Sequence, residues 1–138
     1  MGALMSKCEI IRIDHIVMTV ANISKTIDFY VDVLGTNAIE FVPPTGGQAR
    51  QALHFGNQKI NLHDAASPYT PNAQTPQVGS VDLCFISVQP LSEWQAHLET
   101  HGVAIEEGPV HKIGANGTLL SLYIRDPDCN LIEISNYI

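Results

Sequence analysis

The sequence predicts an α+β fold of two tandem βαβββ modules, whose strands form a curved mixed-sheet trough with the helices on its outer face. The 138 residues suit one compact domain, and 45% of them are apolar, enough for a core. Strand-like and helix-like segments follow one order, and that order then repeats in the same apolar register. We therefore expect one domain over 1–138, with module one at about 10–63, a connector at 64–78 and module two at 79–138.

The first module begins with a strand predicted over 10–20, a stretch rich in β-branched side chains. A helix follows over 22–35, with Ser24 as its cap and Gly35 at its end. Three short strands complete the module, and a Gly-Asn pair between the last two indicates a hairpin turn. These strands are predicted in IEFVPP (39–44), QALHFG (51–56) and KINLHD (59–64).

The second module repeats this order after a connector without a strong period. A strand is predicted over 80–88 and a helix over 90–102. The segment VAIEEGPV, 103–110, is again typical of a strand. Two final strands are joined by the turn-rich tetrad DPDC. They are predicted in TLLSLYIR (118–125) and NLIEISNYI (130–138).

Composition excludes several classes of function. Seven Lys and Arg against fourteen Asp and Glu give a net charge of −7, which argues against nucleic acid and anionic membrane surfaces as partners. No apolar run approaches the roughly 20 residues that span a bilayer. The first residues lack the apolar core of a signal peptide. Cys8, Cys84 and Cys129 form no CxxC pair, so we expect a reducing, cytoplasmic location.

Alternation along the strands places a set of polar residues on the sheet faces that point away from the helices. A single polar residue there is ordinary for a sheet face open to water. Two histidines with carboxylates at matching positions of two modules are instead typical of a divalent-metal site. The residues of this set are His15, Asn61, His63, Asp82 and Glu133.

Several stretches resemble the vicinal oxygen chelate superfamily, which includes glyoxalase I, fosfomycin- and bleomycin-resistance proteins and extradiol dioxygenases. They are IDFYVDVLG, DHIVMTV, EEGPV and YIRDPDCNLIEI, and the resemblance covers about 10–137. FGNQKINLH and YIRDPDCNLIEIS further resemble glyoxalase domain-containing proteins and their bacterial, virulence-associated relatives. The resemblance implies the glyoxalase-type fold, a divalent metal (Ni, Co, Zn, Mn or Fe), a small-molecule substrate and a homodimer. The metal site would then lie within one chain or between two.

The resemblance also implies roles for single residues. His15 takes the ligand position of the first strand, Asp82 its equivalent in module two, and Glu133 the final carboxylate. Glu133 is also our expected proton-transfer residue, with His63 or Asp82 as the alternatives. Asn61 stands where glyoxalase I enzymes of the bacterial type have Glu, and a neutral amide replaces a carboxylate poorly. His63, two residues further along the same face, is either the replacement metal ligand or a substrate-binding or structural group.

Three further residues complete the expectations. Lys112 and Asn61 are predicted substrate contacts, with Lys112 placed to hold an acidic substrate tail. Cys129 occupies a turn position where the family usually has Gly, so we expect it to strain or reshape that hairpin.

Three functions remain open from the sequence. The first is a metal-dependent lyase or isomerase of the glyoxalase type, acting on a small α-ketoaldehyde–thiol adduct (lactoylglutathione lyase-like). The second is an iron-dependent enzyme like the extradiol dioxygenases, which Asp82 in place of a second-module histidine disfavours. The third is a non-enzymatic small-molecule binding or resistance protein. The first is the function we expect.

Overall fold

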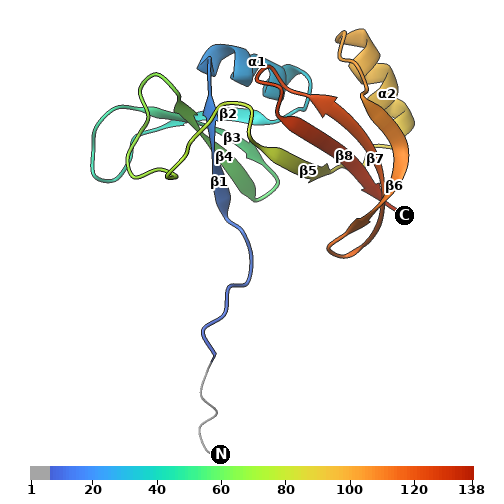
Figure 1. The fold of residues 1–138 in the computed structure, drawn as a ribbon, viewed down its shortest axis with the longest axis horizontal. Coiled ribbons are helices and arrows are strands. Elements are labelled where there is room, and N and C mark those ends of the chain that lie inside the picture. Colours follow the sequence, from blue (N-terminus) through green and yellow to red (C-terminus); the bar gives the residue numbers. More distant parts are fainter. Residues whose placement is uncertain (1–6) are drawn as a thin grey trace, which may run out of the picture.

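The computed structural model describes residues 7–138 and consists of two βαβββ modules, each with one four-stranded mixed sheet and one helix (Figure 1). The strand order is β1-β4-β3-β2 in the first sheet and β5-β8-β7-β6 in the second. The pairs β1–β4 and β5–β8 are parallel, and the remaining pairs are antiparallel. The predicted α+β fold class is confirmed, and the first six residues of the predicted domain lie outside the described part of the chain.

The elements follow the predicted order along the chain. No helix between residues 7 and 138 is long and apolar enough to cross a bilayer. Module one has β1 (His15–Val20), α1 (Ile23–Asp32), β2 (Asn37–Phe41), β3 (Arg50–Phe55) and β4 (Gln58–Asp64). Module two has β5 (Asp82–Ile86), α2 (Leu91–Thr100), β6 (Glu107–Gly114), β7 (Gly117–Arg125) and β8 (Leu131–Tyr137).

The first strand is shorter than predicted. Residues 10–14 carry β-branched side chains but form no strand, and Ile10 is 93% exposed. The reason is pairing, because β1 hydrogen-bonds only to β4 and their register starts at His15 opposite Lys59. Beyond that point β1 has no neighbouring strand, and β propensity alone does not hold an unpaired segment extended.

The start of α1 also differs from the prediction. Asn22, not Ser24, is the cap, with an extended backbone and a side-chain oxygen that accepts a 2.9 Å hydrogen bond from the Lys25 N–H. Asparagine and serine cap helices about equally well, so the sequence did not distinguish the two positions. The helix ends at Asp32, and Gly35 lies just beyond it with a φ of +73°.

The second strand of module two, β6, begins later than predicted. It runs from Glu107 to Gly114 rather than over 103–110, and it pairs with β7 up to Gly114 opposite Gly117. Val103 and Ile105 instead pack against the core as part of the connection from α2. The prediction followed their apolar character and missed that this character serves burial rather than strand pairing.

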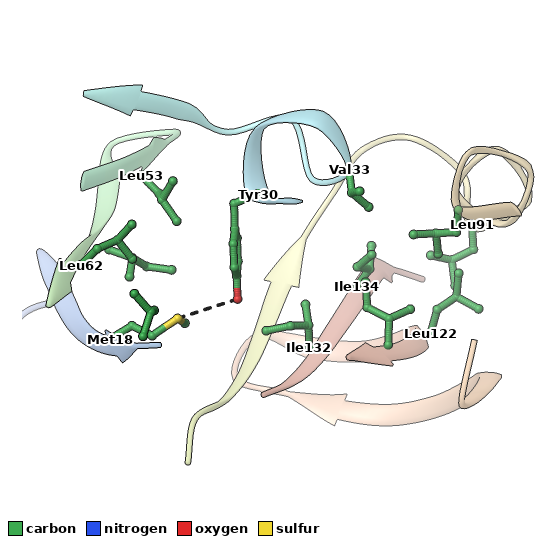
Figure 2. Packing of buried hydrophobic residues seen from close by; sticks show 13 residues of the cluster. Met18, Tyr30, Val33, Leu53, Leu62, Leu91, Leu122, Ile132 and Ile134 are labelled. Carbon is green, nitrogen blue, oxygen red and sulfur yellow. Dashed lines mark hydrogen bonds between the residues drawn. The ribbon is translucent and has the colours of Figure 1, made fainter. Parts of the chain in front are cut away.

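One hydrophobic core joins the two modules (Figure 2). Alternate residues of β1 and β8 point into it, among them Met18 and Ile132, as the period of two predicts. Tyr30 of α1 lies between the modules and is fully buried. Its hydroxyl lies 3.9 Å from the sulfur of Met18 and donates a 2.6 Å hydrogen bond to Asp126 Oδ2, which ties module one to the β7–β8 turn. The opposite faces carry the polar residues predicted for the site, some of them buried, such as Asn61 and His63.

Candidate functional site

The polar residues predicted for the site lie on the two sheet faces that point away from the helices. His15, Asn61 and His63 belong to the sheet of module one. Asp82 and Glu133 belong to the sheet of module two. The structure thus divides the predicted set between two sheets, and each half has its own surroundings.

Glu133 is the best-positioned carboxylate. It is half-buried on β8, and its Oε2 accepts a 2.6 Å hydrogen bond from Ser121 and a 3.3 Å hydrogen bond from Ser135. Burial, followed by the hydrogen bond and charge of Glu133, raises the pKa of Tyr123 to about 12. A carboxylate held by two hydroxyls on a sheet face has a defined orientation, as a metal ligand or proton-transfer group requires.

Cys84 and Asp82 lie beside Glu133 on the same face. Cys84 is directly opposite Glu133 in the parallel β5–β8 register, and its sulfur lies 3.4 Å from Ser135 Oγ. Burial is the main reason that the pKa of the Cys84 thiol is raised, and the charges of Glu133 and Asp82 add to this effect. A thiol with a raised pKa is a weak nucleophile. The chemistry of this face therefore belongs to its carboxylates.

His15 lies at the start of β1, where the two modules approach each other. Its Nδ1 lies 2.9 Å from Asp14 Oδ1, and its side chain is 42% exposed. A cavity of about 620 Å³ is lined by His15 and Lys59 from module one and by Cys84 and Ile86 from module two. His15 therefore shares a cavity with the strand that pairs to Glu133.

His63 is held differently from the other predicted ligands. Its side chain is only 3% exposed, and its Nε2 accepts a 2.5 Å hydrogen bond from Arg50 Nη2. Burial, followed by the positive charge of Arg50, lowers the pKa of His63. Because an arginine can only donate, the neutral ring carries its proton on Nδ1. A metal at His63 would therefore have to displace Arg50 or the Nδ1 proton.

Asn61 is buried on the same strand. Its side chain is 5% exposed, and its Oδ1 has no hydrogen-bond partner among residues 7–138. It lies opposite Val17 and Ala52 on the neighbouring strands, so its immediate cross-strand neighbours are apolar. An unpartnered buried amide oxygen has a free-energy cost, which a ligand that donates a hydrogen bond would remove.

No group of three or more His, Cys, Asp or Glu side chains in the described part of the chain lies close enough to hold a metal ion. The structure brings Asp82 and Glu133 to one sheet face and places His15 in the adjoining cavity. It leaves His63 beside Arg50. The metal roles of His15, His63, Asp82 and Glu133 stay predictions.

Two residues that shape these surroundings, Arg50 and Ser121, were not predicted from the sequence. Arg50 was missed because the predicted strand began at residue 51, one position too late. Alternation with Ala52 and His54 would have placed Arg50 on the open face. Ser121 lies in an apolar run, and only its register opposite Ser135 reveals its contact with Glu133.

Lys112 is exposed on β6, and its Nζ lies 5.5 Å from the centre of the Tyr123 ring. It therefore lies near the Glu133 surroundings, but its role as a substrate contact stays a prediction. Cys129 has a φ of +66°. The structure thus confirms that Cys129 occupies a turn position with the backbone of a glycine.

Comparison with known proteins agrees with this architecture. Residues 12–134 match the Glyoxalase/Bleomycin resistance protein/Dioxygenase superfamily. The chain is 49% identical over 125 residues to glyoxalase domain-containing protein RDO1 of Mycosarcoma maydis, covering 91% of this chain and 68% of the relative. It is 50% identical over 127 residues to virulence protein STM3117 of Salmonella typhimurium, covering 92% and 85%. It is also 30% identical over 129 residues to mouse mitochondrial methylmalonyl-CoA epimerase, covering 89% and 71%.

Solved structures show the same relationship. An integron cassette protein from the mobile metagenome of V. cholerae superposes with a TM-score of 0.90 at 49% identity, covering 96% of this chain and all of that one. Lactoylglutathione lyase from Agrobacterium tumefaciens superposes with a TM-score of 0.66 at 25% identity, covering 91% and 92%. The chain belongs to the glyoxalase/bleomycin resistance protein/dioxygenase superfamily.

Proposed function

We propose that the protein is a divalent-metal-dependent lyase or isomerase of the glyoxalase type, which acts on a small α-ketoaldehyde–thiol adduct. The observation that carries this proposal is the Glu133 carboxylate, oriented by Ser121 and Ser135 next to the cavity that His15 lines. The likeness to a lactoylglutathione lyase and to an epimerase supports it, since both names describe enzymes.

The donor set suits a divalent metal of the first transition row. One imidazole and two carboxylates, from His15, Asp82 and Glu133, match the nitrogen and oxygen ligands that Ni, Co, Zn, Mn and Fe accept. His63 is a fourth ligand only if it releases Arg50. When bound, the metal supplies positive charge that stabilises negative charge developing on substrate oxygens.

The residues of the chain supply the remaining chemistry. Glu133 moves a proton between neighbouring substrate carbons, because its Oε2 is oriented and its face adjoins a cavity. Ser121 and Ser135 position Glu133 rather than contact the substrate. Lys112 and Asn61 bind the substrate, the first through charge and the second through its unpartnered Oδ1.

A second copy of the chain completes the site in this proposal. Within one chain the predicted ligands lie on two separate sheets, and the open faces expose large apolar side chains. Val17 of the first sheet is 44% exposed and Ile86 of the second is 50% exposed. Apolar groups on an open sheet face favour a covering partner, and symmetric homodimers are the commonest soluble assemblies.

A turnover assay tests the proposed function. The protein is treated with a chelator, reloaded separately with Ni, Co, Zn, Mn or Fe, and given methylglyoxal with glutathione. We expect turnover with at least one metal and a loss of about 100-fold or more in Glu133→Gln, as for removal of a general acid–base group. The matched control is Glu99→Gln, which removes an exposed carboxylate from α2 and should retain full activity.

One observation favours a second candidate, a binding protein without catalytic activity. Asn61 is a buried neutral amide at the position where the sequence resemblance to glyoxalase I places a carboxylate. If no divalent metal gives turnover in this assay, the lyase proposal is wrong and the binding role replaces it.

A further inference from the structure

A hollow in module one combines a cation, an aromatic ring and a buried histidine. Its volume is about 260 Å³, and its wall includes Arg50 of β3, His63 of β4 and Tyr69 of the connector between the modules. The connector residues Ser67 and Pro68 also line it. Arg50 and Tyr69 have no role in the proposed metal chemistry.

The Arg50 guanidinium is held between aromatic rings. Its central carbon lies 4.2 Å from the centre of the Tyr69 ring and 5.4 Å from that of Phe41. Stacking on rings occupies the flat faces of a guanidinium and leaves its N–H edge for hydrogen bonds. On that edge Nη2 donates to His63, whereas Nε is buried and has no partner among residues 7–138.

Arg50 also has no carboxylate partner in the described part of the chain, where the ion pairs are Asp14–His15 and Glu106–Arg125. Asp64 also lines the hollow, but it forms no ion pair with Arg50, and its Oδ1 accepts a 2.8 Å hydrogen bond from the Ala66 N–H. A partly buried cation without a counter-charge is unusual, above all in a chain whose net charge is −7.

His63 contributes a second unpartnered donor. With Nε2 accepting from Arg50, the neutral ring carries its proton on Nδ1, and that atom is buried without a partner among residues 7–138. His63 also lines a second cavity of about 400 Å³, together with Thr19 of β1. Because the two ring nitrogens point in diverging directions, His63 Nδ1–H points away from Arg50. The hollow therefore presents a positive charge and the buried, unpartnered Nε–H of Arg50, and a buried donor without an acceptor costs about 1–3 kcal/mol.

We propose that this hollow binds the carboxylate of a small organic acid, with Arg50 Nε–H as the charged donor. A carboxylate fits because one of its oxygens can accept a charge-assisted hydrogen bond from Nε–H, the donor of this guanidinium that has no partner among residues 7–138. Tyr69 and His63 position the guanidinium for this contact. The site goes beyond the proposed function, because Arg50 would hold the acid by charge and hydrogen bonding and not through a metal.

Calorimetric titration of the chelator-treated full chain with pyruvate, in Tris chloride at low ionic strength, tests the proposal. We expect saturable binding by the wild type. Arg50→Gln should weaken it by about ten-fold or more, the usual effect of losing a charged hydrogen bond. Arg12→Gln is the matched control, because it removes the same charge from an exposed residue outside the hollow and should leave the affinity within about two-fold.

Arg50→Lys keeps the proposal testable if Arg50→Gln does not fold. It retains the charge but lacks the Nε–H, so we expect it to fold and to bind pyruvate about five-fold or more weakly. Histidine ring signals in NMR spectra, with His63 assigned from His63→Gln, should shift on titration and so locate the ligand.

Several results would overturn the assignment. The first is that the wild type shows no saturable binding of pyruvate. The second is that Arg50→Lys or Arg50→Gln binds pyruvate as tightly as the wild type. The third is that Arg12→Gln loses as much affinity as Arg50→Gln. Binding that appears only with added metal would place the acid elsewhere. Inorganic phosphate that binds as tightly as pyruvate would show that the hollow recognises charge alone. A His63 signal that does not move would exclude this location.

Discussion

At the scale of single residues, the structure separates histidines that the sequence could not distinguish. His15 is half-exposed beside Asp14 and lines the cavity between the modules, whereas His63 is buried and bound to Arg50. The sequence placed both on open sheet faces, because alternation gives the face of a side chain but not its partner. The difference arises from Arg50, whose side chain reaches His63 across the β3–β4 pair.

Tyr30 gives a prediction about stability. Its buried hydroxyl donates a 2.6 Å hydrogen bond to Asp126 Oδ2, and Asp126 is 5% exposed. Tyr30→Phe removes this donor from a carboxylate and should lower the free energy of unfolding by about 1.5–3 kcal/mol. Urea unfolding measures the loss. Tyr137→Phe is the control, since Tyr137 is exposed on the last strand and its substitution should change stability by less than about 0.5 kcal/mol.

His63 gives a prediction about pH. Burial and then Arg50 lower the pKa of His63 in the folded chain, whereas the unfolded chain has the ordinary value of about 6.5. Below that pH, His63 binds a proton more readily in the unfolded chain than in the folded chain. The contribution of His63 to stability is therefore complete above about pH 6.5 and is lost as the pH falls below it.

Urea unfolding of the wild type and His63→Gln at about pH 8 and about pH 5.5 measures this effect. Other groups titrate in both proteins, so the comparison isolates His63. The wild type should lose more free energy of unfolding than the variant on acidification. Equal losses would contradict the lowered pKa of His63.

At the scale of secondary-structure elements, the β7–β8 turn carries a local cost. Cys129 is exposed and has a φ of +66°, a conformation that favours glycine over residues with a Cβ atom. Cys129→Gly should raise the free energy of unfolding by about 0.5–1 kcal/mol, since the relief of strain exceeds the entropy that glycine adds to the unfolded chain. Cys129→Ala keeps the Cβ atom and should be nearly neutral. If Cys129→Ala gains as much as Cys129→Gly, strain at this residue is not the cause.

Much of each element could be predicted because burial and alternation agree. Leu83 and Phe85 of β5 pack against the core as their period predicts, and so do Ile132 and Ile134 of β8. The ends of helices and strands were harder to predict from the sequence. The start of β1 depends on where β4 begins, and the cap of α1 depends on which of two suitable residues adopts an extended backbone.

At the scale of the whole molecule, the βαβββ repeat could be predicted from the sequence. The way in which the two sheets form a site could not. The repeat predicted one site built from matching positions of the two modules, and the structure places His15 on one sheet and Glu133 on the other. How open sheet faces meet depends on the shape of a second surface, and the pattern of one chain does not contain that information. Our proposal therefore assigns the second surface to another copy of the chain.

The metal content of the purified protein decides whether His15 and Glu133 hold a divalent metal. Wild type, His15→Ala and Glu133→Ala are loaded with one divalent metal, freed of excess by gel filtration and measured by elemental analysis, with Glu99→Gln as the control. The account predicts about one metal per chain in the wild type and in Glu99→Gln, and a large loss in His15→Ala and Glu133→Ala. Equal metal content in the wild type, His15→Ala and Glu133→Ala would contradict it.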